Sequence, residues 1–184
     1  MDPETPAQVA DVLGVLAIAG AVAAVVLLLG FAVPALRARI IEPLVGTATV
    51  LALGVAVVAT AGSLWFSEAA GFPPCELCWY QRIAMYPLVA VLAVAAWKRH
   101  EASGRLIAFV VAGAGLAVNT WHNVVETFPD SGTGGGCDPT NPCTLRWVEG
   151  LGFWTIPRLA TVCFVLILVL TAVDHLFTDP GVNE

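Results

Sequence analysis

Charged side chains are scarce in this chain of 184 residues: only 12% are Asp, Glu, Lys or Arg, while 58% are hydrophobic. Water-soluble domains typically carry about 25% charged residues, so this chain has too few to cover a globule in water. Basic residues are the scarcest, with eight in total, a single lysine among them, and a formal net charge of −6. Eight basic residues scattered along the chain form no basic stripe, which excludes nucleic acid as a partner.

Long stretches without charge indicate the fold class. Two of them have 25 residues each, more than the roughly 20 that a helix needs to cross a bilayer. The fourth stretch has only 16 residues and needs its flanks to complete a crossing. We expect an all-α integral membrane protein that crosses the bilayer five times. The expected spans are residues 12–36, 43–67, 77–97, 106–121 and 156–177.

The distribution of Lys and Arg predicts the orientation. Five of the eight basic residues lie in the first and third connections, and the positive-inside rule makes those connections cytoplasmic. They are Arg37, Arg39, Lys98, Arg99 and Arg105. We therefore expect a multi-pass protein of the cell membrane with its N-terminus and both cysteine-bearing loops extracytoplasmic and its C-terminus cytoplasmic. A cleaved signal peptide is disfavoured because the N-terminal segment is acidic and its apolar run is too long.

One cysteine pair, Cys75 and Cys78, lies where the second connection meets the third span. Two consecutive prolines precede it, so a helix should begin close to the pair. Backbone N–H groups at a helix N-terminus stabilise a thiolate, and Arg82 lies one turn after Cys78. We therefore expect the Cys78 thiolate to be the more stabilised and to face the membrane, with Cys75 as the more exposed exchanger.

Other uses of this pair are a structural disulfide or half of a metal site, with Arg82 only anchoring the helix end at the interface. A c-type haem site is excluded, because Trp79 and not histidine follows the second cysteine.

A second pair, Cys137 and Cys143, closes a seven-residue ring after a glycine-rich stretch at residues 131–136. Such a stretch is typical of a flexible tether. On the loop-entropy model so small a ring gains only about 2 to 2.5 kcal/mol, and an exposed, weakly held disulfide tends to be an oxidant. A staple for a flexible loop is the alternative. Cys163, inside the last span, is expected to be an inert apolar residue.

The segment Cys75-Glu-Leu-Cys78-Trp-Tyr-Gln-Arg82 resembles the signature of the disulfide-bond-formation protein B (DsbB) family, including its shorter BdbC-type members. The resemblance covers about residues 44–177, with a His122-led motif after the fourth span and the loop cysteine pair. It implies a four-helix bundle at 44–184 with outer loops at 67–78 and 122–155. Residues 1–43, an extra helix and its turn, depart from the family's usual form, and so does the close spacing of the loop pair.

The resemblance implies an enzyme, a protein-disulfide:quinone oxidoreductase. Its partners would be an extracytoplasmic thioredoxin-like (DsbA-like) thiol oxidase, a membrane quinone of the ubiquinone or menaquinone type, and the lipid bilayer. Electrons would pass from the partner to Cys137 and Cys143, then to Cys75 and Cys78, and then to the quinone. The resemblance implies that Arg82 and His122 bind the quinone. For His122, a purely structural hydrogen bond is an equally good interpretation.

Three other classes fit parts of the pattern. Enzymes like vitamin-K-epoxide reductase also join loop cysteines to a membrane CxxC, but there the loop pair comes first in the chain. A metal-binding protein could use all four outer cysteines, although the C-x5-C spacing and the oxidising compartment disfavour it, and we expect no metal. A non-enzymatic scaffold with two permanent disulfides is the third.

Overall fold

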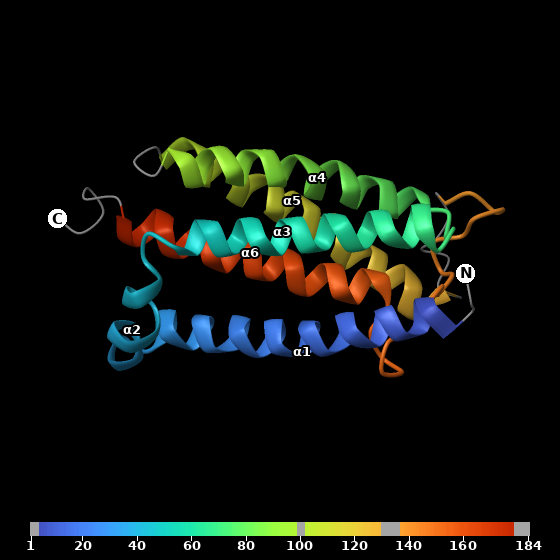
Figure 1. Ribbon diagram of the computed structural model, residues 1–184, viewed down its shortest axis with the longest axis horizontal. Coiled ribbons are helices and arrows are strands. Elements are labelled where there is room, and N and C mark those ends of the chain that lie inside the picture. Colours follow the sequence, from blue (N-terminus) through green and yellow to red (C-terminus); the bar gives the residue numbers. More distant parts are fainter. Residues whose placement is uncertain (1–3, 99–101, 130–136, 179–184) are drawn as a thin grey trace.

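Five long helices lie side by side in the computed structural model, which describes residues 4–98, 102–129 and 137–178 (Figure 1). Each is long and apolar enough to span a membrane, which confirms the expected all-α membrane protein. In the described residues the β structure is a single bridge between Gly150 and Trp154. The long helices are α1 (Glu4–Ala32), α3 (Ala48–Leu64), α4 (Glu76–Trp97), α5 (Ala102–Thr127) and α6 (Ile156–Thr178).

Proline ends the first membrane span earlier than the sequence suggested. The first span was expected to continue to residue 36, but α1 ends at Ala32 and Pro34 begins a separate short helix, α2 (Pro34–Ile40). Proline lacks the N–H that an uninterrupted helix needs there, and it forces the preceding Val33 into an extended conformation (φ −114°, ψ 108°). A 3-10 turn, η1 (Glu42–Leu44), then leads to α3, and a π-helical turn, η2 (Trp65–Ala69), extends the C-terminal end of α3.

The fourth span is longer than its uncharged run suggested. Helix α5 has 26 residues and ends at Thr127, so His122 belongs to a helix and not to the following loop. The flanks complete the crossing, as expected. Within the helix, Asn119 is buried against α6 and Glu126 is buried against the loop.

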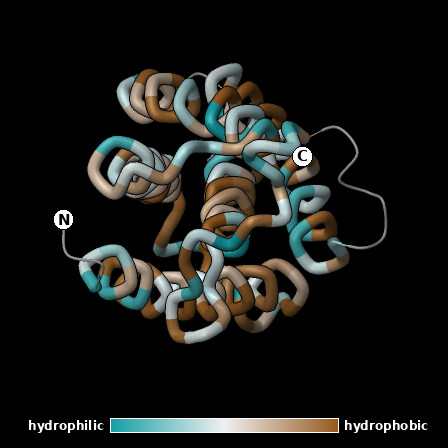
Figure 2. The backbone as a smooth tube through the Cα atoms, turned by 90° about the vertical axis from the view of Figure 1, so that its right-hand side faces the viewer, coloured by the Kyte–Doolittle hydropathy of each residue, from teal (hydrophilic) through white to brown (hydrophobic). Residues whose placement is uncertain are grey.

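Helices α3, α4, α5 and α6 form the bundle, and α1 packs along α6. Their shared core includes Leu88, Leu92, Phe164 and Ile167, all fully buried. Helices α5 and α6 approach closely because Gly115 has no side chain, and a Cβ there would overlap the Phe164 ring. Figure 2 shows apolar positions on the outward faces of the helices as well. Those outward faces suit contact with lipid.

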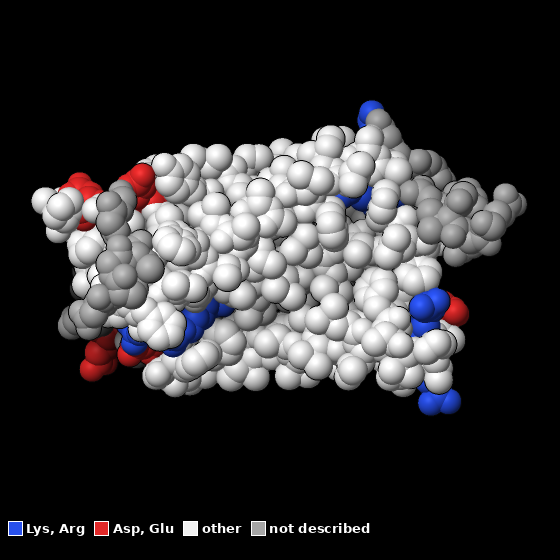
Figure 3. Space-filling model, turned by 180° about the vertical axis from the view of Figure 1, so that it is seen from behind, with Lys and Arg blue, Asp and Glu red and all other residues white. Residues whose placement is uncertain are grey.

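Charged side chains gather towards the two ends of the molecule and leave the middle uncharged on the face shown in Figure 3. Asp174 near the end of α6 differs from these surface charges, because it is only 3% exposed. Its carboxylate accepts hydrogen bonds from the backbone N–H groups of Gly46 and Thr49 at 2.6 and 2.7 Å. It thus caps the N-terminus of α3 from a neighbouring helix, which satisfies donors that the helix itself leaves unpaired.

Candidate redox site

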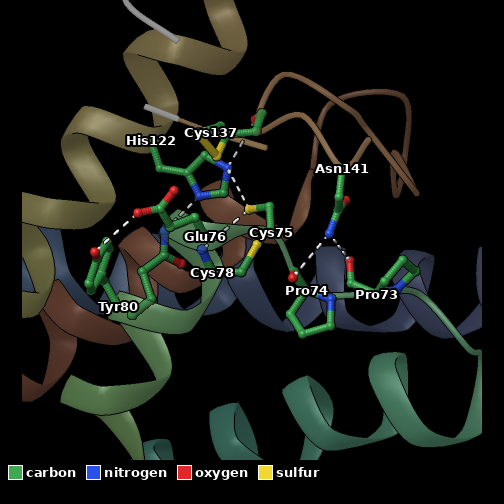
Figure 4. The surroundings of a disulfide bond; sticks show 11 residues. Pro73, Pro74, Cys75, Glu76, Cys78, Tyr80, His122, Cys137 and Asn141 are labelled. Atoms are coloured by element: carbon green, nitrogen blue, oxygen red, sulfur yellow. Dashed lines mark hydrogen bonds between the residues drawn. A yellow bond between two sulfur atoms is a disulfide. The ribbon is translucent and has the colours of Figure 1, made fainter. Parts of the chain in front are cut away.

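The two cysteine pairs meet at one end of the bundle (Figure 4). Cys137 and Cys143 form a disulfide, while Cys75 and Cys78 are free thiols. Cys75 and Cys143 are 5% and 1% exposed and share one buried cluster with Val125. Cys137 is half-buried and packs against this cluster. Residues far apart in the chain are therefore packed together in one cluster.

Cys75 and not Cys78 occupies the favourable position at the start of α4. Cys75 is the N-cap residue, and its sulfur accepts a hydrogen bond from the backbone N–H of Cys78 at 3.3 Å. A hydrogen bond from the Cys78 thiol, together with a hydrogen bond from His122, lowers the pKa of Cys75 to about 5 against the opposing effect of burial. The expectation that Cys78 has the more stabilised thiolate is wrong, because the helix begins one residue after Cys75.

His122 on α5 lies between the two pairs. Its Nε2 is 3.1 Å from the backbone carbonyl oxygen of Cys143 and 3.7 Å from Cys75 Sγ. A carbonyl oxygen can only accept, so we assign the proton to Nε2, which points it at both cysteines. The side-chain amide of Gln81 lies 2.7 Å from the other ring nitrogen, Nδ1, and donates to it in this assignment.

The ring of the loop pair is docked onto the chain that leads into α4. Asn141 Nδ2 donates to the carbonyl oxygens of Pro73 and Pro74 at 3.3 and 3.1 Å (Figure 4). Inside the ring, the Asp138 carboxylate accepts the N–H and hydroxyl of Thr140, both at 2.8 Å, which lowers the pKa of Asp138. The glycine-rich stretch expected to tether this ring, residues 131–136, lies outside the described residues.

A cavity of about 450 Å³ lies on the other side of the dithiol, between α1, α3, α4 and α6. Cys78 lines it, whereas Cys75 and His122, both within the described residues, do not. Most of its walls are apolar, with a polar group at one end formed by Ser63, Arg82 and Tyr86. His122, which the resemblance implies as a quinone-binding residue, lies against Cys75 and Cys143, and its contact with a quinone stays a prediction.

The polar end of the cavity is fixed by hydrogen bonds. Arg82 donates from Nε to the Ser63 hydroxyl at 3.1 Å and from a terminal nitrogen to the Ser63 carbonyl at 3.0 Å. The Tyr86 hydroxyl donates to the Ser63 hydroxyl oxygen at 3.2 Å. The guanidinium also lies over the Trp79 ring, 5.3 Å from its centroid. A rigidly held cation beside a thiol and an apolar cavity can stabilise negative charge that develops there.

Three residues of the site were missed in the sequence. Gln81 belongs to the segment from Cys75 to Arg82. A polar side chain one turn after the cysteines on an apolar helix could have indicated a site residue. Ser63 and Asn141 carried no such signal, because their partners, Arg82 and two proline carbonyls, are brought to them only by the fold.

A metal ion remains a chemical alternative for part of the site. Ligand atoms of Cys75, Cys78 and His122 all lie within 4.8 Å of one another. A site that uses all four outer cysteines is inconsistent with the structure, because Cys137 and Cys143 are bonded to each other.

A helical membrane protein in which a loop disulfide packs against a dithiol at a helix start has the layout of a membrane thiol–disulfide oxidoreductase. Comparison with known proteins agrees: the model of the family described as "Disulfide bond formation protein DsbB" matches residues 45–174, well over half of the chain. The chain belongs to this family.

Two relatives illustrate the similarity. The chain is 45% identical over 118 residues to a "Probable disulfide formation protein" of Oceanobacillus iheyensis, covering 62% of this chain and 79% of that protein. It is 39% identical over 115 residues to "Disulfide bond formation protein C" of Bacillus subtilis, covering 62% and 83%. No solved structure matches the chain significantly. Helix α1 lies outside the matched residues.

Proposed function

We propose that this protein re-oxidises an extracytoplasmic thioredoxin-like thiol oxidase and passes the electrons through its two cysteine pairs to a membrane quinone. One observation carries the proposal. In the inner pair, Cys75 is buried against Cys143 of the loop disulfide, while Cys78 lines the cavity. The arrangement supports a path from the loop through the dithiol to a bound acceptor. The N-terminal end of the bundle is extracytoplasmic in this proposal, in keeping with the basic connections Arg37–Arg39 and Lys98–Arg105 at the other end.

The partner first reacts with the loop disulfide. One partner thiolate attacks Cys137, the more exposed sulfur, and Cys143 leaves as a thiolate. The second partner thiol then attacks the mixed disulfide, which oxidises the partner and frees Cys137. Two electrons and two protons have left the partner at this point, and the loop pair is reduced.

The loop pair then reduces the inner pair. Cys143 attacks Cys75 of the Cys75–Cys78 disulfide, and Cys78 leaves as a thiolate. Cys137 next attacks Cys143, which restores the loop disulfide and expels Cys75. A thiol of low pKa leaves faster, so the N-cap position and pKa of about 5 favour Cys75 as the leaving group.

The residues around the cavity fit a quinone, which accepts two electrons and two protons when it is bound. Cys78 faces the cavity as the donor, and Arg82 stabilises the negative charge that develops on the acceptor. Re-forming the Cys75–Cys78 bond requires a thiolate at neutral pH, and Cys75 supplies it. The Cys75 hydrogen bond to His122 holds that thiolate in place until the bond forms.

Quinone reduction by a reduced thioredoxin-like partner tests the proposal when wild type is compared with Cys78→Ser in membranes. Cys78→Ser should lose at least about a thousandfold in rate, as expected when a nucleophile is removed. Its loop disulfide should still oxidise one equivalent of partner, which shows that the variant is folded. Quinone reduction that survives in the variant, or stoichiometric bound metal in the purified wild type, would count against the proposal.

A further inference from the structure

The cavity beside Cys78 is longer than a quinone ring needs. On α3 its lining extends from Ser63 at the polar end to Leu51, twelve residues away, which corresponds to about 18 Å at 1.5 Å per residue. Away from Ser63, Gln81, Arg82 and Tyr86 the walls are apolar. The cavity therefore has a polar end beside the dithiol and a long apolar arm towards the middle of the bundle.

Helix α1 forms one wall of this arm. Leu13, Leu16 and Ala17 of α1 line it opposite residues of α3, with Val162 and Leu166 of α6 between them. Leu13 also reaches across towards α3, where its Cδ1 would lie 3.7 Å from a Cβ at Gly62. Removing α1 would leave the arm open to lipid along its length, since the remaining walls come from α3, α4 and α6.

The position of α1 is specified by small residues and one polar contact. A Cβ at Gly20 would lie 2.9 Å from Val162 of α6, and a Cβ at Gly14 would lie 3.0 Å from Trp154. Small residues of this kind let membrane helices approach closely. Asp11 Oδ1 accepts the backbone N–H of Leu151 at 2.7 Å and ties α1 to the turn that precedes α6. Helix α1 is thus held at one position along α6, beside the cavity.

We propose that α1, which lies outside the family match, is a specificity element that binds the polyprenyl tail of the quinone against α3 and α6. The inference rests on the proposed quinone reduction and adds to it. The ring occupies the polar end at Cys78 and Arg82, and the tail follows the apolar arm along Leu16 and Ala17. A tail is the occupant that the geometry favours, because the arm is continuous with the end that holds the reacting thiol.

Two headgroup-matched quinones test this inference, one with a single isoprene unit and one with a long polyprenyl tail. Binding is measured by quenching of intrinsic tryptophan fluorescence, since Trp147 lines the cavity, and KM is measured in parallel. In Ala17→Phe the added ring fills the arm, and the Kd for the long-tailed quinone should rise about tenfold. The Kd for the short-tailed quinone should change by less than about twofold.

Matched controls come from the lipid-facing side of α1. Ala19 and Val15 are exposed and do not line the cavity, so Ala19→Phe and Val15→Ala should bind both quinones as wild type does. Where Ala17→Phe fails to assemble, Leu16→Ala replaces it and should weaken only the long-tailed quinone, by about threefold.

Equal losses for both quinones, or none for either, would overturn the role of α1. Binding of both quinones by the wild type without reduction of either would instead overturn the proposed function and leave the binding comparison valid. Failure of the wild type to bind either quinone would overturn both.

Discussion

The two cysteine pairs differ in how the chain holds them. Cys75 and Cys78 are set at the first turn of α4, a helix inside the bundle, and the helix N-terminus acts directly on Cys75. Cys137 and Cys143 lie in a small ring outside the helices, shaped by its own side chains and docked through Asn141. The inner pair therefore has its reactivity set by a rigid element, whereas the loop pair depends on docking.

Each pair nevertheless has an outer and an inner sulfur. Cys137 is half-buried and Cys143 is 1% exposed, while Cys75 faces the loop pair and Cys78 faces the cavity. The four sulfurs thus form an ordered series from the surface to the cavity. Direction in such a series comes from access and from thiolate stability, since the bonds exchanged are chemically alike.

The largest expected effect concerns which sulfur of the loop pair the partner reaches. A partner variant that keeps only its nucleophilic cysteine should form a covalent complex with the wild-type protein through Cys137. Mass spectrometry of the trapped complex should find the linkage at Cys137 almost exclusively, because Cys143 is buried against Cys75 and Val125.

The inner pair provides the contrast. Cys75→Ser should form the same complex with Cys137, whereas Cys137→Ser should form none through the loop. Linkage mainly at Cys143 or Cys75 would show that the ring opens before the partner binds, and the ordered series would then be wrong.

Much of this comparison was predictable from the sequence, and the reasons are physical. The five spans follow from the length of the apolar runs, which a bilayer requires whatever the packing. That Cys75 faces the loop and Cys78 the cavity follows from their order along the chain, but the expectation that Cys75 is the more exposed sulfur is wrong. Cys75 is 5% exposed because it is buried against Val125 and Cys143, whereas Cys78 is half-buried. The thiolate preference was predicted wrongly because it depends on a single residue of helix register, and a run of polar and apolar residues does not define a helix start so finely.

Contacts between segments that are distant in the chain could not be predicted from the sequence. His122 was singled out from its motif, but its position against Cys75 and Cys143 depends on how α5 rotates against α4. Gln81, its partner, becomes meaningful only once that rotation is known. The role of α1 beside the cavity likewise depends on packing, because its apolar run alone is compatible with any neighbour.

A second prediction concerns the thiolate of the inner pair. A pKa of about 5 means that Cys75 is protonated well below this pH and is a thiolate above it. The rate of Cys75 alkylation in the reduced protein should therefore rise as the pH increases through about 5 and then level off by about pH 6. Peptide mapping after pulses of iodoacetamide measures the rate, and an ordinary thiol would continue to gain reactivity up to about pH 9.

Variants at His122 and Gln81 sharpen this test. His122→Ala removes a hydrogen bond to Cys75 and should shift the alkylation midpoint to higher pH. Gln81→Leu leaves Nδ1 of His122 without its donor and should shift the midpoint in the same direction by less. A midpoint unchanged in both variants would show that the helix and Cys78 alone stabilise the thiolate.

The smallest expected effect concerns the docking of the loop ring. Asn141→Ala removes two hydrogen bonds to the prolines before Cys75, each worth about 1 kcal/mol at most in a partly exposed site. Transfer from the loop pair to the inner pair should slow by about fivefold, while quinone reduction by a small dithiol that reaches the inner pair directly should be unchanged. Stopped-flow measurement with pre-reduced partner separates the two steps. Thr140→Ala is the matched control, because the hydrogen bonds of Thr140 to Asp138 stay inside the ring. Equal slowing in both variants would mean that the shape of the ring, and not its docking on the α4 segment, governs exchange between the pairs.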